Sequence, residues 1–324
     1  MRVVQVFRKA KKGNHSIERV FSSISENINE NFNCKIFKVE FNGSLPKLLK
    51  DVYKIEPDVI HITGDVHYLS LLFPRKKTIL TIHDLGYFKN YKLSVKKIIY
   101  LIIWFIIPVR YTNNITVVSK QTKIDLIRYT LINSKKISLI PNPLVQKLNK
   151  LHKSNNNYFN ILQIGTGFHK NLRNLVKAVI GMKIKLIIVG NPEKELINLM
   201  ETNCINHEIH FNVSDKKLNQ LYCCSDLLFF ASLSEGFGLP ILEAQSLGIP
   251  VITSNFNPMR DVAGAGACLV DPKSVTEIRN TIETIINNKK IKEKIINSGF
   301  ENYTKYSIDL ISRMYFDKYY ETSS

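Results

Sequence analysis

Two glutamates flank a glycine-rich turn in residues 232–253, whose sequence is SLSEGFGLPILEAQSLGIPVIT. Glu235 precedes the turn, and Glu243 follows it eight positions later. A carboxylate accepts hydrogen bonds at both oxygens, so either residue can hold the neighbouring hydroxyl groups of a ribose or a sugar. Gly236 and Gly238 let the backbone turn tightly and approach a ligand closely. These residue types predict a binding site for a hydroxyl-rich ligand.

The glutamates lie in a pattern of strand, turn, helix and strand. DLLFFAS (226–232) is a continuous apolar run, which is typical of a strand buried on both faces. Pro240 suits the first position of a helix, the next residues are good helix formers, and Gly248 ends the helix. PVIT (250–253) follows as a second apolar strand. In such a unit a ligand binds beyond the carboxyl ends of the strands, where the free amides and the helix dipole favour a diphosphate.

The backbone amides of the turn are the expected contacts of that diphosphate: Gly236, Phe237, Gly238 and Leu239. Glu243 would then hold a ribose, and Glu235 a second polyol. A phosphate between two hydroxyl-rich groups describes a nucleotide-sugar. The alternative is that Glu243 only complements the helix dipole and Glu235 is a solvated loop charge. We favour the nucleotide-sugar because the strand–turn–helix context of the motif is present too.

Charge is unevenly distributed along the 324 residues, which are enough for two domains of ordinary size. Residues 1–150 carry 26 Lys and Arg against 10 Asp and Glu, a net charge of +16 out of the total of +18. The first half is therefore where an anionic surface or substrate would bind. The apolar run IIYLIIWFIIPV (98–109) is shorter than the roughly 20 residues that span a bilayer. We expect it to form a buried or membrane-surface helix.

We expect the protein to be cytoplasmic, with peripheral contact at the inner face of the cell membrane. The start, MRVVQVFRKAKKG, has the pattern of a strand and a basic loop, and it is not typical of a secretion signal. The five cysteines are odd in number and lack the spacing of metal ligands, so reduced thiols are expected.

Strands and helices alternate in two series, which predicts an α/β fold with parallel sheets covered on both faces. The first series lies within residues 1–147, and the second lies within residues 158–302 after a polar, asparagine-rich linker. An amphipathic stretch from about Thr276 to Tyr320 is interpreted as several helices, the last of which (about 303–324) could pack back on the first domain. We predict two doubly wound, Rossmann-like domains facing a central cleft. The expected strands of the two series include KIFKVEF (35–41), TILTIH (78–83), KISLI (136–140), NILQIG (160–165), IKLIIVG (184–190) and EIHFNV (208–213).

From about residue 78 to 320 the chain resembles the retaining glycosyltransferase family 4 (glycosyl transferases group 1), whose members have the two-domain GT-B fold. SEGFGLPILEA (234–244) resembles the family's glutamate–seven–glutamate motif, with Glu235 and Glu243 as its acids. IGTGFHKNLRNLVKA (164–178) is similar to the loop that carries the family's phosphate-binding lysine, here Lys170. Weaker similarity lies in PMRDVAGAGACLVDP, TIHDLGYF, ITVVSKQTKIDL and IPNPL.

Lys170 also makes physical sense on its own. It follows a strand and a loop with two glycines and opens the next helix, so its ammonium can contact a phosphate. The alternative is a lysine that points into water. The family usually has an arginine a few residues before this lysine, where this chain has Thr166 or Gly167. Thr166 is counted among the donor-binding residues, and Arg173 and Arg260 are candidates to replace the arginine.

Three histidines and one glycine of the first half are further candidates. His83 ends a strand at the carboxyl edge of the first sheet, and the resemblance implies that a histidine here touches the donor sugar; the alternative is a core histidine. Gly13 could let the helix that follows it approach the diphosphate. His61 and His67 could line the acceptor side or have a structural role. Lys170, Glu235 and His83 are the expected catalytic residues.

The resemblance implies sugar transfer from a nucleoside-diphosphate sugar, with retention, to a glycan or lipid-linked acceptor, as in bacterial surface polysaccharide synthesis. The chain has no Asp-x-Asp sequence and no clustered His or Cys ligands, so we expect no metal and no other cofactor. Lys170 and the amides would neutralise the leaving group. One alternative is a nucleotide-sugar epimerase or hydrolase of the same fold. A basic nucleic-acid-binding protein would explain the charge but not the two glutamates, so no nucleic-acid partner is expected.

Overall fold

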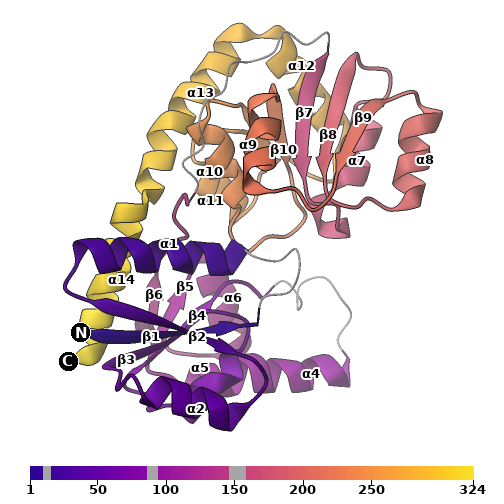
Figure 1. Ribbon diagram of the computed structural model, residues 1–324. Helices are drawn as coiled ribbons and strands as arrows, with labels where there is room; N and C mark the ends of the chain where they lie inside the picture. Colours follow the sequence, from indigo (N-terminus) through magenta and orange to yellow (C-terminus); the bar gives the residue numbers. More distant parts are fainter. Residues whose placement is uncertain (10–15, 86–93, 146–157) are drawn as a thin grey trace. The chain divides into compact units, whose positions relative to one another are not determined.

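The chain folds into two compact units in a computed structural model that describes residues 1–9, 16–85, 94–145 and 158–324. Unit 1 comprises Met1–Val145 and Tyr306–Ser324, and unit 2 comprises Gln146–Lys305. Each unit contains a six-stranded parallel sheet (Figure 1). The α/β fold class with two doubly wound sheets, predicted from the sequence, is confirmed.

The sheet of unit 1 has the strand order β2-β1-β3-β4-β5-β6. Its strands are rich in Val and Ile, and β3 and β4 are buried along their whole length, as expected for a sheet covered on both faces. The strands are β1 (Arg2–Arg8), β2 (Lys35–Phe41), β3 (Val59–Ile62), β4 (Thr78–Ile82), β5 (Asn114–Val117) and β6 (Ile137–Leu139).

Helices follow most strands of unit 1, and side-chain caps fix where several begin. Ser119, for example, accepts a hydrogen bond from the amide of Thr122 at the start of α6. The helices and helical turns are α1 (Ser16–Asn31), α2 (Leu45–Tyr53), a 3₁₀ turn (His67–Leu72), α4 (Val95–Leu101), a π-helical turn (Ile102–Ile106), α5 (Ile107–Tyr111), α6 (Lys120–Thr130), a 3₁₀ turn (Ser134–Lys136) and α14 (Ile308–Ser323). The apolar run at 98–109 is therefore part of one continuous helical stretch from Val95 to Tyr111.

The last helix, α14, completes unit 1 by packing beside α1 (Figure 1). A buried chain of polar groups joins it to the sheet. Gln5 on β1 donates to the hydroxyl of Tyr319 at 3.0 Å, and this hydroxyl lies 2.8 Å from Nδ1 of His61 on β3. Nε2 of His61 lies 2.7 Å from Oγ1 of Thr81 on β4. Because buried polar groups require partners, this series of hydrogen-bonded side chains fixes the position of α14 on the sheet.

The sheet of unit 2 has the order β12-β11-β10-β7-β8-β9. Its strands are β7 (Phe159–Ile164), β8 (Ile184–Val189), β9 (Asn206–His210), β10 (Leu227–Phe230), β11 (Val251–Ser254) and β12 (Cys268–Val270). Its helices and turns are a 3₁₀ turn (Phe168–Lys170), α7 (Leu172–Ala178), α8 (Lys194–Thr202), α9 (Asp215–Cys223), α10 (Leu239–Ser246), α11 (Met259–Ala263), α12 (Val275–Asn287), α13 (Lys289–Tyr303) and a 3₁₀ turn (Thr304–Tyr306), which crosses into unit 1.

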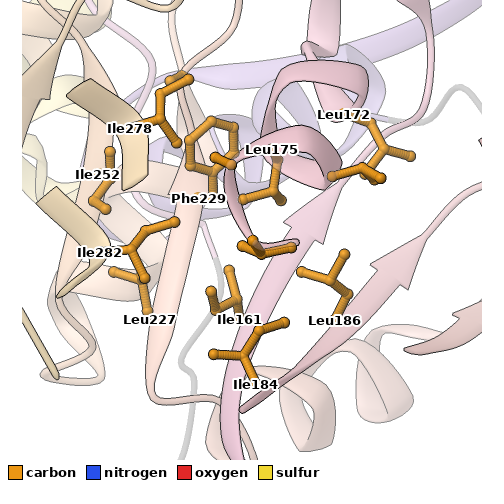
Figure 2. Packing of buried hydrophobic residues seen from close by; sticks show 14 of the residues in the cluster. Ile161, Leu172, Leu175, Ile184, Leu186, Leu227, Phe229, Ile252, Ile278 and Ile282 are labelled. Atoms are coloured by element: carbon orange, nitrogen blue, oxygen red, sulfur yellow. The ribbon is translucent and has the colours of Figure 1, made fainter. Parts of the chain in front are cut away.

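Figure 2 shows the hydrophobic core on one face of this sheet. Alternate strand residues such as Leu227 and Phe229 point toward the helices. Ile278 and Ile282, one turn apart on α12, and Leu175 on α7 pack in the same cluster. Burying each such side chain contributes roughly 1.5–3 kcal/mol, so this cluster holds α7 and α12 firmly on the strands that carry the site.

Most strands begin or end within one to three residues of the predicted limits, and two of them show why the limits differ. The stretch KISLI forms a strand only at Ile137–Leu139, and EIHFNV is displaced, because β9 covers Asn206–His210. β9 is an edge strand whose extent is set by pairing with β8, and this pairing ends at Val189 and His210. Gly190 then turns away with φ +143°, so Phe211 has no partner strand and is exposed. The apolar pattern alone could not show where the pairing stops.

Candidate functional site

The glycine turn between β10 and α10 depends on Gly238. This residue has φ +121°, a conformation that L side chains rarely adopt, and a Cβ here would lie 3.1 Å from Cδ1 of Ile241. α10 begins at Leu239, so Pro240 is its second residue and not its first. Gly236 and Phe237 lie in the link from the strand to the amino end of this helix, where the dipole is positive, and Leu239 is the first residue of the helix.

Lys170 and Glu235 form an ion pair, with Nζ 2.6 Å from Oε1. Both side chains are largely buried, 21% and 14% exposed. The ammonium also lies 4.9 Å from the ring centroid of Phe230, the last residue of β10. The two residues meet because β7 and β10 are hydrogen-bonded neighbours, so the loops at their carboxyl ends share one edge of the sheet.

The loop that presents Lys170 is tightly constrained. Gly165 has φ +86°, and a Cβ at this position would lie 2.9 Å from Cγ of Lys170. Gln163 donates to the carbonyls of Gly165 and Lys170 at 3.1 and 3.0 Å. The sequence predicted that this lysine opens the next helix, and this prediction is wrong. Lys170 ends a 3₁₀ turn, and α7 begins at Leu172, because Asn171 between them adopts a left-handed conformation.

Asn171 was not predicted as part of the site. Its buried side chain donates to the carbonyls of Ala231 and Pro272, at 2.9 and 2.7 Å. The amide of Leu233 donates to the carbonyl of His169 at 2.7 Å. These bonds join the lysine loop to the chain beyond β10 and β12. A left-handed asparagine after a lysine carries no sequence signal strong enough to predict them.

Glu243 lies inside unit 2, where only 8% of its surface is exposed. The hydroxyl of Tyr222, which is fully buried on α9, donates to Oε2 of Glu243 at 2.6 Å. Such a charge-assisted hydrogen bond orients the carboxylate and compensates for its burial. Tyr222 was also missed, because α9 precedes β10 and no motif links the two residues.

Thr166, in the loop between β7 and Lys170, lies against the end of the neighbouring strand β8. Gly190 there has φ +143°, and a Cβ at Gly190 would lie 2.7 Å from Cγ2 of Thr166. The absence of a side chain at Gly190 thus makes room for Thr166 within the lysine loop.

The two candidate arginines make other contacts. Both terminal nitrogens of Arg173 donate to Glu195 on α8, at 3.0 and 2.8 Å. Arg260 on α11 donates to the carbonyl of Asn255 at 3.4 Å. Neither contact involves Lys170 or Glu235.

The three candidate histidines of unit 1 are buried. His83 follows β4, is 7% exposed, and has Nε2 2.8 Å from the carbonyl of Thr63. Burial lowers the pKa of His83, so the neutral ring donates to this carbonyl. His61 lies within β3 and not at its end, and burial lowers its pKa to about 3. Nδ1 of His67 lies 3.0 Å from the carbonyl of Trp104, and burial lowers the pKa of His67 to about 4. Of the two roles considered for His61, lining the acceptor side or supporting the structure, the structural one therefore fits. Gly13, the candidate glycine of the first half, lies outside the described residues.

In the part of the chain that the structure describes, no three His, Cys, Asp or Glu side chains are grouped as metal ligands would be. Across residues 1–9, 16–85, 94–145 and 158–324, no helix has both the length and the apolar character needed to cross a bilayer.

Similar proteins were found by sequence and by structure. The O-antigen chain mannosyltransferase RfbU of Salmonella typhimurium is 29% identical over 261 residues, which cover 76% of this chain and 70% of that protein. CapM of Staphylococcus aureus, a capsular polysaccharide biosynthesis glycosyltransferase, is 29% identical over 198 residues, 56% of this chain and half of that protein. Anabaena HepE, solved with UDP and glucose, has a TM-score of 0.79 at 16% identity and covers 98% of this chain and 99% of its own.

Two family models cover most of the chain. Residues 4–145 match Glycosyltransferase Family 4, and residues 146–302 match Glycosyl transferases group 1. A sucrose-phosphate synthase from Thermosynechococcus elongatus has the same fold, with a TM-score of 0.80 at 16% identity over 99% of this chain and 98% of its own. With the acidic pair and the lysine of unit 2 in place, these matches make the chain a member of glycosyltransferase family 4, a glycosyltransferase with the GT-B fold.

Proposed function

We propose that this enzyme transfers a sugar from a nucleoside-diphosphate sugar to a glycan or lipid-linked acceptor and retains the anomeric configuration. The observation that carries the proposal is the Lys170–Glu235 pair at 2.6 Å beside the amino end of α10. The relatives named for O-antigen and capsule synthesis support a role in bacterial surface polysaccharide synthesis. The fold neighbour solved with UDP and glucose supports the donor class.

Each donor group is assigned to a particular residue. Glu243, oriented by Tyr222, accepts hydrogen bonds from the ribose hydroxyls. Lys170, Thr166 and the amides at 236–239 bind the diphosphate, since an ammonium and a helix amino end both favour phosphate. Glu235 accepts hydrogen bonds from the sugar hydroxyls.

Transfer takes place on one face of the sugar. The bond from the anomeric carbon to the diphosphate oxygen breaks, and a bond from the same carbon to the acceptor oxygen forms. The acceptor proton passes to the departing phosphate oxygen, so no side chain acts as nucleophile. Lys170 and the amides of the turn stabilise the negative charge that develops on the leaving group, and no metal is required in this scheme.

Unit 1 is assigned to the acceptor. Its sequence carries most of the positive charge, which favours an acceptor held at the anionic inner face of the cell membrane. His83 is the residue of unit 1 proposed to touch the donor sugar. Because Nε2 donates its only proton to the carbonyl of Thr63, the neutral ring can accept a hydrogen bond from a sugar hydroxyl at Nδ1 but adds no charge to the site.

A thermal-shift panel of UDP, GDP, ADP and CMP sugars tests the donor class, because a ligand that binds the folded state raises the melting temperature. We expect one nucleoside-diphosphate sugar to give a shift that Glu243→Gln removes. Glu195→Gln, which changes an exposed glutamate of the same unit that pairs with the exposed Arg173, serves as the matched control. No shift with any of these donors would contradict the proposal.

Product analysis separates the remaining alternatives. A transferase leaves the donor largely intact without acceptor, whereas an epimerase or hydrolase converts it, and NMR of the new linkage reports retention or inversion. Strong, salt-sensitive RNA binding without nucleotide-sugar binding would favour the nucleic-acid alternative.

A further inference from the structure

The helical stretch Val95–Tyr111 of unit 1 is apolar on both sides. Its inner side contributes Phe105 and Val109 to the core of unit 1. Its outer side exposes six aliphatic residues, between 39% and 73% each, and each lies three or four positions from another of the six, so that they form one stripe. This aliphatic stripe consists of Val95, Ile98, Ile99, Ile102, Ile103 and Ile107.

Scattered exposed apolar residues are normal, but a contiguous group of them marks an interaction surface. The stripe holds six of the 22 large hydrophobic residues that are exposed among the described residues, within only 13 positions. The π-helical turn Ile102–Ile106 lies in its centre, and such turns are rare and often found at functional sites. The stripe is therefore expected to be covered by a partner.

The charge around the stripe indicates which partner this is. Between Leu85 and Ile124 the sequence contains no Asp or Glu. Exposed Lys96 and Arg110 lie near the two ends of the stripe. The basic turn Arg75–Lys76–Lys77 adjoins its carboxyl end, because the carbonyl of Arg75 accepts a hydrogen bond from the amide of Asn113. An aliphatic face with exposed cations near both ends matches a bilayer with anionic headgroups, since the side chains enter the acyl boundary and the cations meet phosphates.

We propose that the aliphatic stripe docks unit 1 on an anionic lipid bilayer, with the helix lying in the plane of the interface. The stripe would form the membrane contact that is part of the proposed function. The identity of the acceptor rests on that proposed function. The helix is also joined to the edge of the first sheet. Trp104 donates to the carbonyl of Asp65 at 2.8 Å, and Asp65, beyond β3, pairs with Arg8 at the end of β1. A lipid-linked acceptor would thus emerge from the bilayer beside the carboxyl edge of this sheet.

Vesicle sedimentation without donor or acceptor tests the stripe, so a failure here leaves the donor site unaffected. We expect wild-type protein to bind phosphatidylcholine vesicles that contain phosphatidylglycerol, and to bind pure phosphatidylcholine or high-salt samples much more weakly. Ile99→Ser with Ile103→Ser should raise the lipid concentration for half-binding by roughly tenfold or more. Ile124→Ser is the matched control, because Ile124 is 56% exposed on α6 of the same unit.

Trp104 provides a second readout because it is the only tryptophan in the chain. Lipids with brominated acyl chains should quench its fluorescence in the wild type and in Ile124→Ser, but not in the double variant. Circular dichroism must show that all three proteins are folded. Equal binding to neutral and anionic vesicles, or unchanged binding by the double variant, overturns the proposal. A wild-type dimer in solution that ignores vesicles and that the double variant dissociates overturns it too, in favour of a second copy of the chain.

Discussion

Glu243 shows how much a single hydrogen bond can matter at a buried carboxylate. Removing a carboxylate from water is costly, and the hydroxyl of Tyr222, 2.6 Å from Oε2, offsets part of this cost. Because it holds Oε2, this hydrogen bond also fixes the direction in which Oε1 points. The Lys170–Glu235 pair depends on partners in the same way, since each side chain lies mostly out of water.

Tyr222→Phe should therefore weaken donor binding without blocking transfer. The substitution removes only the hydroxyl, and the loss of a hydrogen bond to a charged group costs roughly 1.5–3 kcal/mol. We expect the KM for the donor to rise about tenfold or more while kcat stays within about twofold. Steady-state kinetics measure both values, with Tyr320→Phe on the exposed side of α14 as the control. A fall in kcat at unchanged KM would assign Tyr222 to the chemical step instead.

Lys170→Ala should give the opposite pattern. If the ammonium stabilises charge that develops on the leaving group, its loss lowers kcat by roughly 10²- to 10³-fold and changes the donor KM much less. Lys177→Ala, an exposed lysine on the neighbouring helix α7, is the matched control.

A double-mutant cycle with Glu235→Gln then tests whether the two residues act together. Their side chains are in contact, so the double variant should lose less activity than the product of the two single effects. Strictly multiplicative losses would show that the ion pair has no functional role.

At the scale of elements, the site lies where two turns meet at neighbouring strands. The sequence alone predicted the glycine turn, the helix after it and the lysine loop, because these signals are local. It did not predict that β7 and β10 are neighbours, which depends on sheet pairing between residues 66 positions apart, such as Ile161 and Leu227. Asn171 and Tyr222 were missed for the same reason, since their partners are brought close only by the folded sheet.

Gly165→Ala tests whether the shape of the lysine loop matters for transfer. The added Cβ would lie 2.9 Å from Cγ of Lys170 and must displace this side chain. Gly181→Ala is the matched control, since Gly181 also has a positive φ, +77°, but has no atom within 4 Å of the added Cβ. Both variants should lose roughly 1 kcal/mol or more of stability through backbone strain.

Only Gly165→Ala should lower kcat, by about tenfold or more, because small displacements of a catalytic group are costly. Thermal unfolding and kcat measured on both proteins separate strain from misplacement. Equal losses of activity in the two variants would mean that backbone strain alone explains the effect.

At the scale of the whole molecule, the alternation of strands and helices predicted the fold class because it follows from hydrophobic period. The contacts that hold α14 in unit 1 could not be derived in this way. They depend on polar residues more than 250 positions apart, and the strand pattern gives no reason for Gln5, His61 and Thr81 to lie within buried strands. Polar residues at core positions break the apolar pattern and are explained only by their partners in the folded chain.

The buried histidines make the stability of unit 1 sensitive to acid. Burial holds the pKa of His61 at about 3 and that of His67 at about 4, and it lowers the pKa of His83, whereas an unfolded histidine titrates near 6.5. Between these values the unfolded chain binds more protons than the folded chain. The free energy of unfolding should therefore fall as the pH drops below about 6.5, by up to ~1.4 kcal/mol per pH unit for each histidine, until the folded-state pKa is reached.

Urea unfolding followed by the fluorescence of Trp104, which lies in unit 1, measures this slope between pH 7 and 5. His61→Gln should reduce the slope by about one histidine's share, because Nδ1 faces the hydroxyl of Tyr319 and protonation would remove the acceptor of this hydrogen bond. His67→Gln should do the same, and it provides the comparison if the first variant is poorly folded. Carboxylates add their own loss of stability only at lower pH, below the range used here. An unfolding free energy that stays constant from pH 7 to pH 5 would mean that these rings are protonated at no cost in the folded protein, and that the polar chain beneath α14 does not depend on a neutral His61.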